Sequence, residues 1–431
     1  MRNLYLFLVL NSLSLVGLTS TVLAADLPAA TIQKATVNVL AQPNFSSQKI
    51  SVLQRNASVK IAAQMGLWYQ LQLTDHLGYV RVNDVRMTAS GKTDGNANLR
   101  VLMGGKAGTG RVTETAGVRG LNESDLKSAS MDNEQLNRMI SQRVDATTAA
   151  SNAANQNWQA TTIAYTGEAK AKKSASSSSN AGSSVARGLL GGIFGGAANL
   201  VPKSEGELSD EELALGPEIA GRILGARPLW NNAIAQQRVN LIGRWIASQT
   251  SRPELPWTFG IIDSSDINAF AAPGGFILMT RGMYQLASID SELGAVLAHE
   301  IAHVVQRDHY NVIHKQQVAK FGKDVVSSQV HTGGGLGGSM ARAYLEEQGA
   351  TVMMTGLDRE AEYQADYAAQ IYLVRAGMNP LALYAILQKM ALLGSQSTDL
   401  AQLFKTHPSL DNRLNRIDLQ SVDLEIYTTR E

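Results

Sequence analysis

Residues 28–88 alternate between apolar and polar positions with the two-residue period of β-strands. In "WYQLQL", Tyr69 and Leu71 fall on one face, and the glutamines fall on the other. A glycine and the turn "TDHLG" separate this run from its neighbours, "VKIAAQ" and "GYVRVN". Short strands joined by tight turns predict a small all-β barrel. Trp68 and Tyr79 are then either aromatics that close the barrel or an exposed recognition patch.

The pattern changes after this segment. Residues 89–206 read as a polar helical segment followed by a linker rich in Ser and Gly. Residues 207–431 carry long amphipathic stretches around one strand-like run, "GGFILMT", which predicts a mainly α-helical domain with a short β-sheet edge strand. The apolar run at 185–202 either docks in a groove, stays mobile or touches a membrane. The glycine-rich run at 331–340 is either a lid or a disordered loop.

The first 24 residues have the three-part layout of a secretory signal, with a positive start, an apolar run and small residues before Ala25. A single membrane anchor is the alternative. The chain has no cysteine, so an exported protein of this sequence has no disulfides. Its 38 basic and 37 acidic residues argue against a nucleic-acid partner. Between Asp26 and Val112, however, ten Lys or Arg stand against four Asp and no Glu, which makes this part basic.

The motif "HEIAH" is a candidate metal-binding motif. His299 and His303 are four residues apart, so on a helix they lie on one face, about 6 Å from each other, and can bind one metal ion. Glu300 lies to one side of that pair, where it can take a proton from water without being a ligand. Paired histidines on an ordinary surface helix remain the alternative until a third ligand is found.

The helical pattern "LDREAEYQADYAAQIYLVRAG" supplies a candidate third ligand. Glu362 and Asp366 are again four residues apart, among alanines small enough for close helix packing. Glu362 can supply an oxygen ligand, and Asp366 can accept the free N–H of a metal-bound His. Glu360 is the rival ligand, but its two-residue offset puts it on a different face of the helix.

The motifs taken together resemble a zinc peptidase family. HEIAH and then "EYQAD", with "NAFAAPGG" upstream and "THPSLDNR" downstream, stand in the order found in the family that includes HtpX, BepA and the CAAX prenyl endopeptidases. The resemblance implies one Zn²⁺ held by His299, His303 and Glu362. It also implies Glu300 as the general base and Asp366 behind a ligand. The expected fold is a zincin peptidase domain of the HExxH…ExxxD (gluzincin) type.

The flanking motifs add further site residues. In the family, His407 approaches the metal and Arg413 lines the same cleft. His407 then either stabilises the oxyanion or occupies the open metal position and keeps the enzyme latent. Upstream, Phe276–Thr280 fits an edge strand that holds the substrate backbone, with a plain core strand as the alternative. The residues expected to shape its entrance are Asn268, Pro273, Gly274 and Gly275.

The N-terminal part resembles bacterial SH3-like domains, through "NVLAQPNFSSQKISVLQRNASVKI", "GLWYQLQL" and "GYVRVNDV". Such modules bind cell-wall peptide or glycan, or dock on a partner domain. The expected organisation is therefore a signal peptide (1–24), an SH3-like domain (28–88), the polar segment and linker (89–206) and a peptidase domain (207–431).

Three hypotheses for the function follow. The first is a periplasmic zinc metalloendopeptidase for extended or misfolded envelope proteins, including outer-membrane proteins, that acts in protein quality control. The second is an envelope-binding or chaperone-like factor with a latent zinc site. The third is a cell-wall peptide hydrolase, which the SH3-like module and the basic front of the chain suggest.

Overall fold

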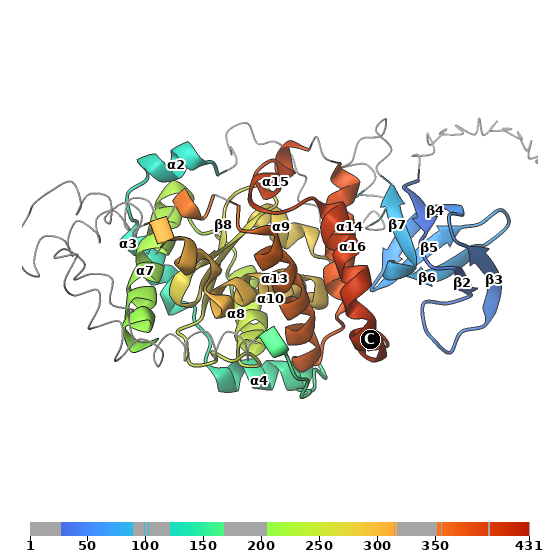
Figure 1. Ribbon diagram of the computed structural model, residues 1–431, viewed down its shortest axis with the longest axis horizontal. Helices are drawn as coiled ribbons and strands as arrows, with labels where there is room; N and C mark the ends of the chain where they lie inside the picture. The colour runs from blue at the N-terminus through green and yellow to red at the C-terminus, as the bar shows by residue number, and fades with distance from the viewer. Residues whose placement is uncertain are drawn as a thin grey trace, which may run out of the picture.

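The structure is a computed structural model that describes residues 27–88, 99, 102, 121–167, 205–313, 315–316, 351–354, 356–394 and 397–430. A β-domain stands at one end of the molecule and a larger helical body forms the rest (Figure 1). The predicted signal peptide, the apolar run at 185–202 and the candidate lid at 331–340 lie outside the described residues. No helix in the described ranges is long and apolar enough to cross a membrane.

The β-domain is one antiparallel sheet, in which the strands follow the order β3-β2-β6-β5-β4-β1-β7. The strands are β1 (Ala29–Ile32), β2 (Thr36–Leu40), β3 (Lys49–Gln54), β4 (Ser58–Met65), β5 (Trp68–Gln72), β6 (Leu77–Arg81) and β7 (Val85–Thr88), with a 3₁₀ turn, η1 (Val82–Asp84), before the last. The predicted alternation holds, because Tyr69 and Leu71 are fully buried while Gln72 is exposed. The order of strands does not show closure into the predicted barrel. Trp68 is buried, with its ring 5.0 Å from that of Phe45.

The helical body is built around a three-stranded sheet in the order β8-β10-β9. Its strands are β8 (Thr258–Ile262), β9 (Ala269–Ala272) and β10 (Phe276–Thr280), with the turn η2 (Pro273–Gly275) between the last two. The helices that precede and follow the sheet are α7 (Glu205–Ala226), α8 (Ala233–Ala247), α9 (Arg281–Leu286), α10 (Asp290–Gln306), α13 (Arg359–Arg375), α14 (Leu381–Leu393), α15 (Leu403–Thr406) and α16 (Leu410–Gln420), with the 3₁₀ turns η3 (Thr398–Leu400) and η4 (Ser421–Tyr427).

The prediction that Phe276–Thr280 is an edge strand is wrong. This segment is β10, the central strand, which pairs in parallel with β8 and antiparallel with β9. Its backbone groups therefore bond to both neighbours, and all five of its residues are buried. The edge strand on the side of α10 is β9, which the described residues pair only with β10.

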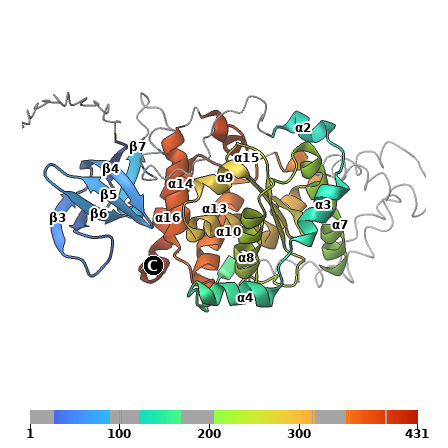
Figure 2. The ribbon, with the colours of Figure 1, turned by 180° about the vertical axis from the view of Figure 1, so that it is seen from behind.

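The polar segment after the β-domain contributes three helices to the helical body. These are α2 (Glu123–Ser128), α3 (Asn133–Ser141) and α4 (Ala146–Asn155), and the side chains of Asn122, Asp132 and Asp145 cap their N-termini. Helices α2 and α3 pack on α7, and α4 packs on α8 (Figure 2). The helical segment is thus part of the same folded body as the sheet.

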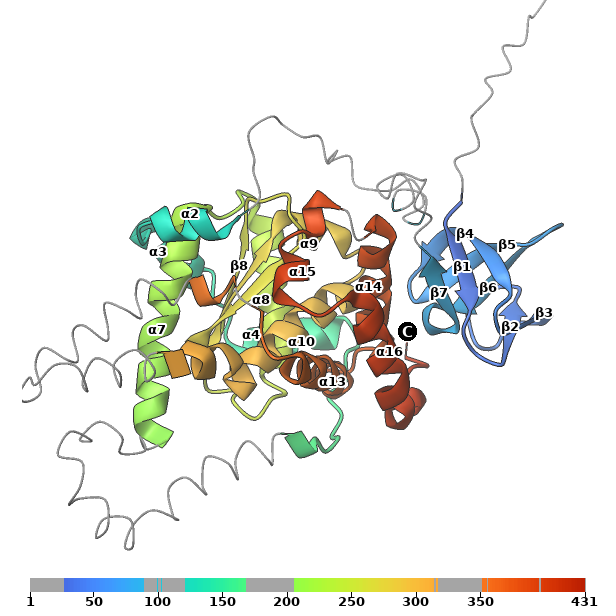
Figure 3. The same ribbon diagram turned by 45° about the horizontal axis from the view of Figure 1, so that its top comes forward.

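The β-domain rests on the helical body rather than standing free. Strand β7 and the turn η1 pack against α14, and α14 and α16 lie between the β-domain and the remaining helices (Figures 1 and 3). Helix α14 also packs on α10, and α10 packs on α13 through small side chains. The buried alanines on these two helices are Ala295, Ala298, Ala302, Ala365, Ala368 and Ala369.

Candidate metal centre

Four side chains from three places in the chain meet in the interior of the helical body. Helix α10 supplies His299 and His303, α13 supplies Glu362, and His407 follows the short helix α15. Their ligand atoms all lie within 4.8 Å of one another. Two histidines one helical turn apart and an acidic residue on the adjacent helix thus converge on one point.

The donor atoms fit a metal ion such as zinc. The Nε2 atoms of His299 and His303 lie 3.1 Å apart. The two carboxylate oxygens of Glu362 lie 3.6 Å from these nitrogens, one from each. Glu362 is fully buried, and its Oε1 has no hydrogen-bond partner among the described residues. A buried carboxylate oxygen without a partner is costly in a protein interior, and a cation between these atoms would remove that cost.

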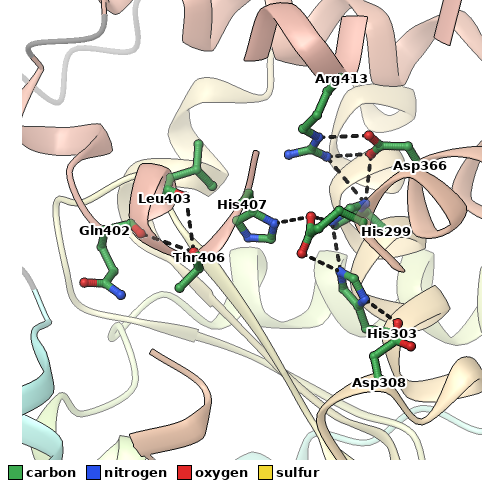
Figure 4. A network of polar contacts seen from close by, with 10 residues as sticks. His299, His303, Asp308, Asp366, Gln402, Leu403, Thr406, His407 and Arg413 are labelled. Carbon is green, nitrogen blue, oxygen red and sulfur yellow. Dashed lines mark hydrogen bonds and ion pairs between the residues drawn. The ribbon is translucent and has the colours of Figure 1, made fainter. Parts of the chain in front are cut away.

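Two further carboxylates hold the imidazole rings from behind (Figure 4). Asp366 lies 3.0 Å from Nδ1 of His299. Asp308 lies 2.8 Å from Nδ1 of His303 and accepts its N–H. Each contact fixes the ring orientation and leaves the Nε2 atom available for a metal. Asp366 was anticipated from the sequence, whereas Asp308 was not.

Asp308 reaches His303 because the backbone turns at the end of α10. Arg307, which caps the helix, has a φ of 59° and therefore a left-handed conformation. This conformation is uncommon for residues other than glycine, and the buried Glu212 accepts a hydrogen bond from the Arg307 Nε at 3.0 Å. The only signal in the sequence is an acidic residue just beyond the metal helix.

Arg413 is hydrogen-bonded to Asp366. Its guanidinium donates two hydrogen bonds to Asp366, at 2.9 and 2.6 Å, and is almost fully buried. A row of polar contacts thus runs from α16 through α13 to α10, by way of Arg413, Asp366 and His299 (Figure 4). Arg413 also lines the pocket that contains His299 and Glu300, so the structure gives it a supporting contact as well as a place in the cleft.

The charges in this cluster shift its pKa values strongly. Burial raises the pKa of Asp366, but the positive charge of Arg413 and hydrogen bonds from His299 and Arg413 outweigh it and lower the pKa to about 2. Burial raises the pKa of Glu362 as well, yet the neighbouring histidines hold it well below its usual range. Burial and Arg413 lower the pKa of His299, but its contacts with Asp366 and Glu362 raise it to about 9.

The raised pKa of His299 gives a test of metal binding. Near neutral pH the metal-free His299 carries a proton, and a metal ligand must be a neutral imidazole. The pKa of His303 is raised as well, so we expect zinc binding to release at least one proton per chain and zinc affinity to fall at least about tenfold for each pH unit of acidification. Calorimetric titration in two buffers of different protonation enthalpy measures the released protons. Binding without proton release near neutral pH would contradict the pairing described here.

His407 lies against the third candidate ligand. Its Nδ1 is 2.6 Å from Oε2 of Glu362, and its ring centre is 5.5 Å from that of His299. His309 also lies close, with its ring centre 5.6 Å from that of His303, but it is not among the four converging donors. Burial lowers the pKa of His309 to about 3, so it is neutral.

A small pocket opens beside these residues. Its polar lining consists of His299, Glu300, His407 and Arg413. The rest of its lining is apolar and comes from β9, α9, α10, α14 and α15, through Ala269, Met283, Val296, Leu383, Ile386, Leu387, Met390 and Leu403. Glu300 thus lies in the pocket with two of the four donors, although it is not a member of the donor group.

The structure does not bring the other predicted substrate-binding residues to this pocket. The turn of Pro273, Gly274 and Gly275 is buried under α7, and the Gly274 N–H donates to Glu212. Asn268 is buried just before β9, and both atoms of its amide have no hydrogen-bond partner among the described residues. Phe276 begins the central strand. Within this part of the fold, Ala269 of β9 is the residue that lines the pocket.

Comparison with known proteins gives consistent matches to one group of peptidases. The chain is 29% identical over 215 residues to the beta-barrel assembly-enhancing protease of Yersinia pestis, which covers 48% of this chain and 43% of the relative. It is 28% identical over 171 residues to the metalloprotease LoiP of Escherichia coli (strain K12), over 39% of this chain and 64% of the relative. A protease HtpX homolog of Syntrophobacter fumaroxidans is 29% identical over 195 residues, 36% of this chain and 67% of the relative.

The chain spans less than half the length of the beta-barrel assembly-enhancing proteases that it matches. Residues 233–420 match the family described as peptidase family M48, and this range runs from the start of α8 to the end of α16. It contains all four converging donors, the two supporting carboxylates and Arg413. The part of the helical body that holds the converging donors is therefore similar to peptidase family M48, and the relatives that it matches are named as proteases.

Proposed function

We propose that this protein is an exported zinc metalloendopeptidase that hydrolyses peptide bonds of extended or misfolded envelope proteins. The observation that carries the proposal is the convergence of His299, His303 and Glu362 within the range that matches peptidase family M48, next to a pocket that contains Glu300. The alternative of paired surface histidines does not fit side chains that are this deeply buried around an unpartnered carboxylate oxygen.

In the proposed mechanism, His299, His303 and Glu362 would hold one zinc ion, which would supply Lewis-acid polarisation of the scissile carbonyl and lower the pKa of the attacking water. Glu300 accepts the proton of that water and passes it to the leaving amine. Asp366 and Asp308 keep the two imidazoles in the orientation that leaves Nε2 free. Arg413 keeps Asp366 ionised and in place.

An extended polypeptide is the substrate class that the pocket favours. Strand β9 is an edge strand of its sheet, and its first residue, Ala269, lines the pocket. An extended polypeptide can pair with such an edge through backbone hydrogen bonds. This kind of pairing recognises the backbone of the substrate more than its side chains. Relatives named beta-barrel assembly-enhancing proteases support outer-membrane proteins as substrates, and we propose the periplasm as the site of action.

The test of this proposal is metal-dependent cleavage of an unfolded protein. We expect a chain that begins at Ala25 to cut unfolded casein, to lose this activity when a chelator removes the metal, and to regain it when zinc is added back. Cleavage is followed by gel electrophoresis and bound zinc by elemental analysis. Cleavage that persists after complete removal of metal would refute the proposal.

The contact between His407 and Glu362 favours a resting state in which His407 blocks the site. Its Nδ1 is 2.6 Å from an oxygen of Glu362, in the space next to the donors. We expect His407→Ala to raise kcat/KM for casein about tenfold, since the change removes a charge-assisted hydrogen bond that holds the blocked state. A fall in kcat of that size would instead assign His407 to stabilisation of the oxyanion.

A further inference from the structure

Helix α14 has two faces with different neighbours. One face carries Leu383, Ile386, Leu387 and Met390, which line the pocket beside His299. These four positions follow the helical repeat and therefore form one stripe. Other residues of the helix contact the β-domain, and α14 lies between that domain and α10 (Figure 3).

Gln388 makes the central contact with the β-domain. Its amide nitrogen donates to the carbonyl oxygens of Val82 and Val85, at 2.9 and 3.0 Å, and its amide oxygen accepts the N–H of Met87 at 2.7 Å. Strand β7, which contains Met87, lies at the end of the sheet order, so Gln388 fills backbone positions that a further strand would occupy. Gln388 is fully buried. Loss of this amide would leave three buried backbone groups without partners.

A second buried contact ties the β-domain to the metal helix itself. Lys389 of α14 pairs with Glu292 of α10 at 2.6 Å, and both side chains are fully buried. Gln64 of strand β4 donates to the other oxygen of Glu292 at 2.8 Å. Glu292 lies seven residues, or two helical turns, before His299 on the same helix. The β-domain therefore completes a polar network that spans both α10 and α14.

Arg86 extends the same interface. Its guanidinium lies over the ring of Tyr384 on α14, 5.4 Å from the ring centre, and pairs with Asp418 of α16 at 2.6 Å. The β-domain is thus attached to the metal helix, the pocket helix and the helix that carries Arg413. This pattern of buried and specific contacts does not fit a module that moves independently of the peptidase.

We propose that the β-domain is a clamp that positions α14 as the wall of the substrate pocket, with Gln388 as its main positioning residue. The pocket wall that the clamp holds is apolar. The inference rests on the proposed peptidase activity for its effect on catalysis, but the coupling between the β-domain and α14 is a property of the fold alone.

The test uses the full chain with Gln388→Leu, which keeps the size of the side chain and removes its amide. We expect faster hydrogen exchange at the Met87 amide and along α14, and a KM for unfolded casein raised about fivefold with a smaller change in kcat. Bound zinc should stay the same. The matched control is Gln72→Leu on the exposed side of the β-domain, which should change neither exchange in α14 nor KM.

Gln64→Ala is a second, milder variant in case Gln388→Leu does not fold. It removes the hydrogen bond that Gln64 of the β-domain donates to Glu292, and it should also speed hydrogen exchange in α14. Faster exchange at Met87 with unchanged exchange in α14 and unchanged KM would overturn the inference, and so would no change at Met87, α14 or KM in either variant. If the wild-type chain does not cleave casein at all, the proposed function fails, while the exchange measurements still decide whether the clamp exists.

Discussion

Replacing Glu300 with Gln is expected to lower kcat for peptide cleavage by a factor of about 10²–10⁴, the usual contribution of a general base. Glu300 lies in the pocket with His299 and His407 but is not one of the four converging donors. The amide of Gln cannot accept the proton of the attacking water, and it leaves the metal ligands in place. The Gln variant should therefore keep about one zinc per chain while cleavage of unfolded casein is lost.

Glu360→Gln is the control for this prediction. Glu360 is exposed on α13 and pairs weakly with Arg416, at 3.6 Å, and the converging donor group does not include it. The same chemical change at Glu360 should leave both zinc and cleavage unchanged. Retained cleavage in Glu300→Gln would mean that another group accepts the proton, and loss of zinc in Glu360→Gln would make Glu360 the third ligand in place of Glu362.

The second large effect is expected for Arg413→Ala, which should lower the free energy of unfolding by about 3–5 kcal/mol. Arg413 and Asp366 are both buried and joined by two hydrogen bonds, so removal of the guanidinium leaves a buried carboxylate without its partner. Arg416→Ala is the control. Arg416 lies three residues later on the same helix, but its side chain is 39% exposed, so its loss should cost less than about 1 kcal/mol.

The same pair predicts a dependence of stability on pH. The pKa of Asp366 is lowered from its usual value of 3.8 to about 2 in the folded protein. A carboxyl with a depressed pKa stabilises the folded state above the unfolded value, and this contribution, about 2 kcal/mol, is lost as pH falls through the folded value. Urea unfolding of the wild type should show this loss below pH 3.8. In Arg413→Ala the folded pKa of Asp366 rises toward or above its unfolded value, so this acid-dependent loss should shrink or disappear. An identical profile in both proteins would exclude the pairing.

The sequence predicted the parts of the site that depend on local helical geometry. His299 and His303, and likewise Glu362 and Asp366, lie on helices at a spacing of four, so their side chains share a face without any knowledge of the tertiary fold. The order of the motifs then placed His407 near the metal site, where the structure also brings it.

Features that depend on tertiary pairing were harder to predict. The motif order favours an edge strand for Phe276–Thr280, although an unbroken apolar run of this kind is typical of a strand that is buried on both faces. Asp308 was missed because it reaches His303 only through the left-handed Arg307. Lys389 is fully buried against Glu292, whereas a lysine on a helix is almost always exposed, so nothing in the sequence indicated this contact.

Zinc bound between α10 and α13 should be visible in crystals of the zinc-loaded chain that begins at Ala25, by anomalous diffraction recorded at the zinc absorption edge. We expect one strong peak at about 2.0–2.2 Å from Nε2 of His299, Nε2 of His303 and an oxygen of Glu362. A zinc-loaded crystal with no peak between these three side chains would contradict this expectation.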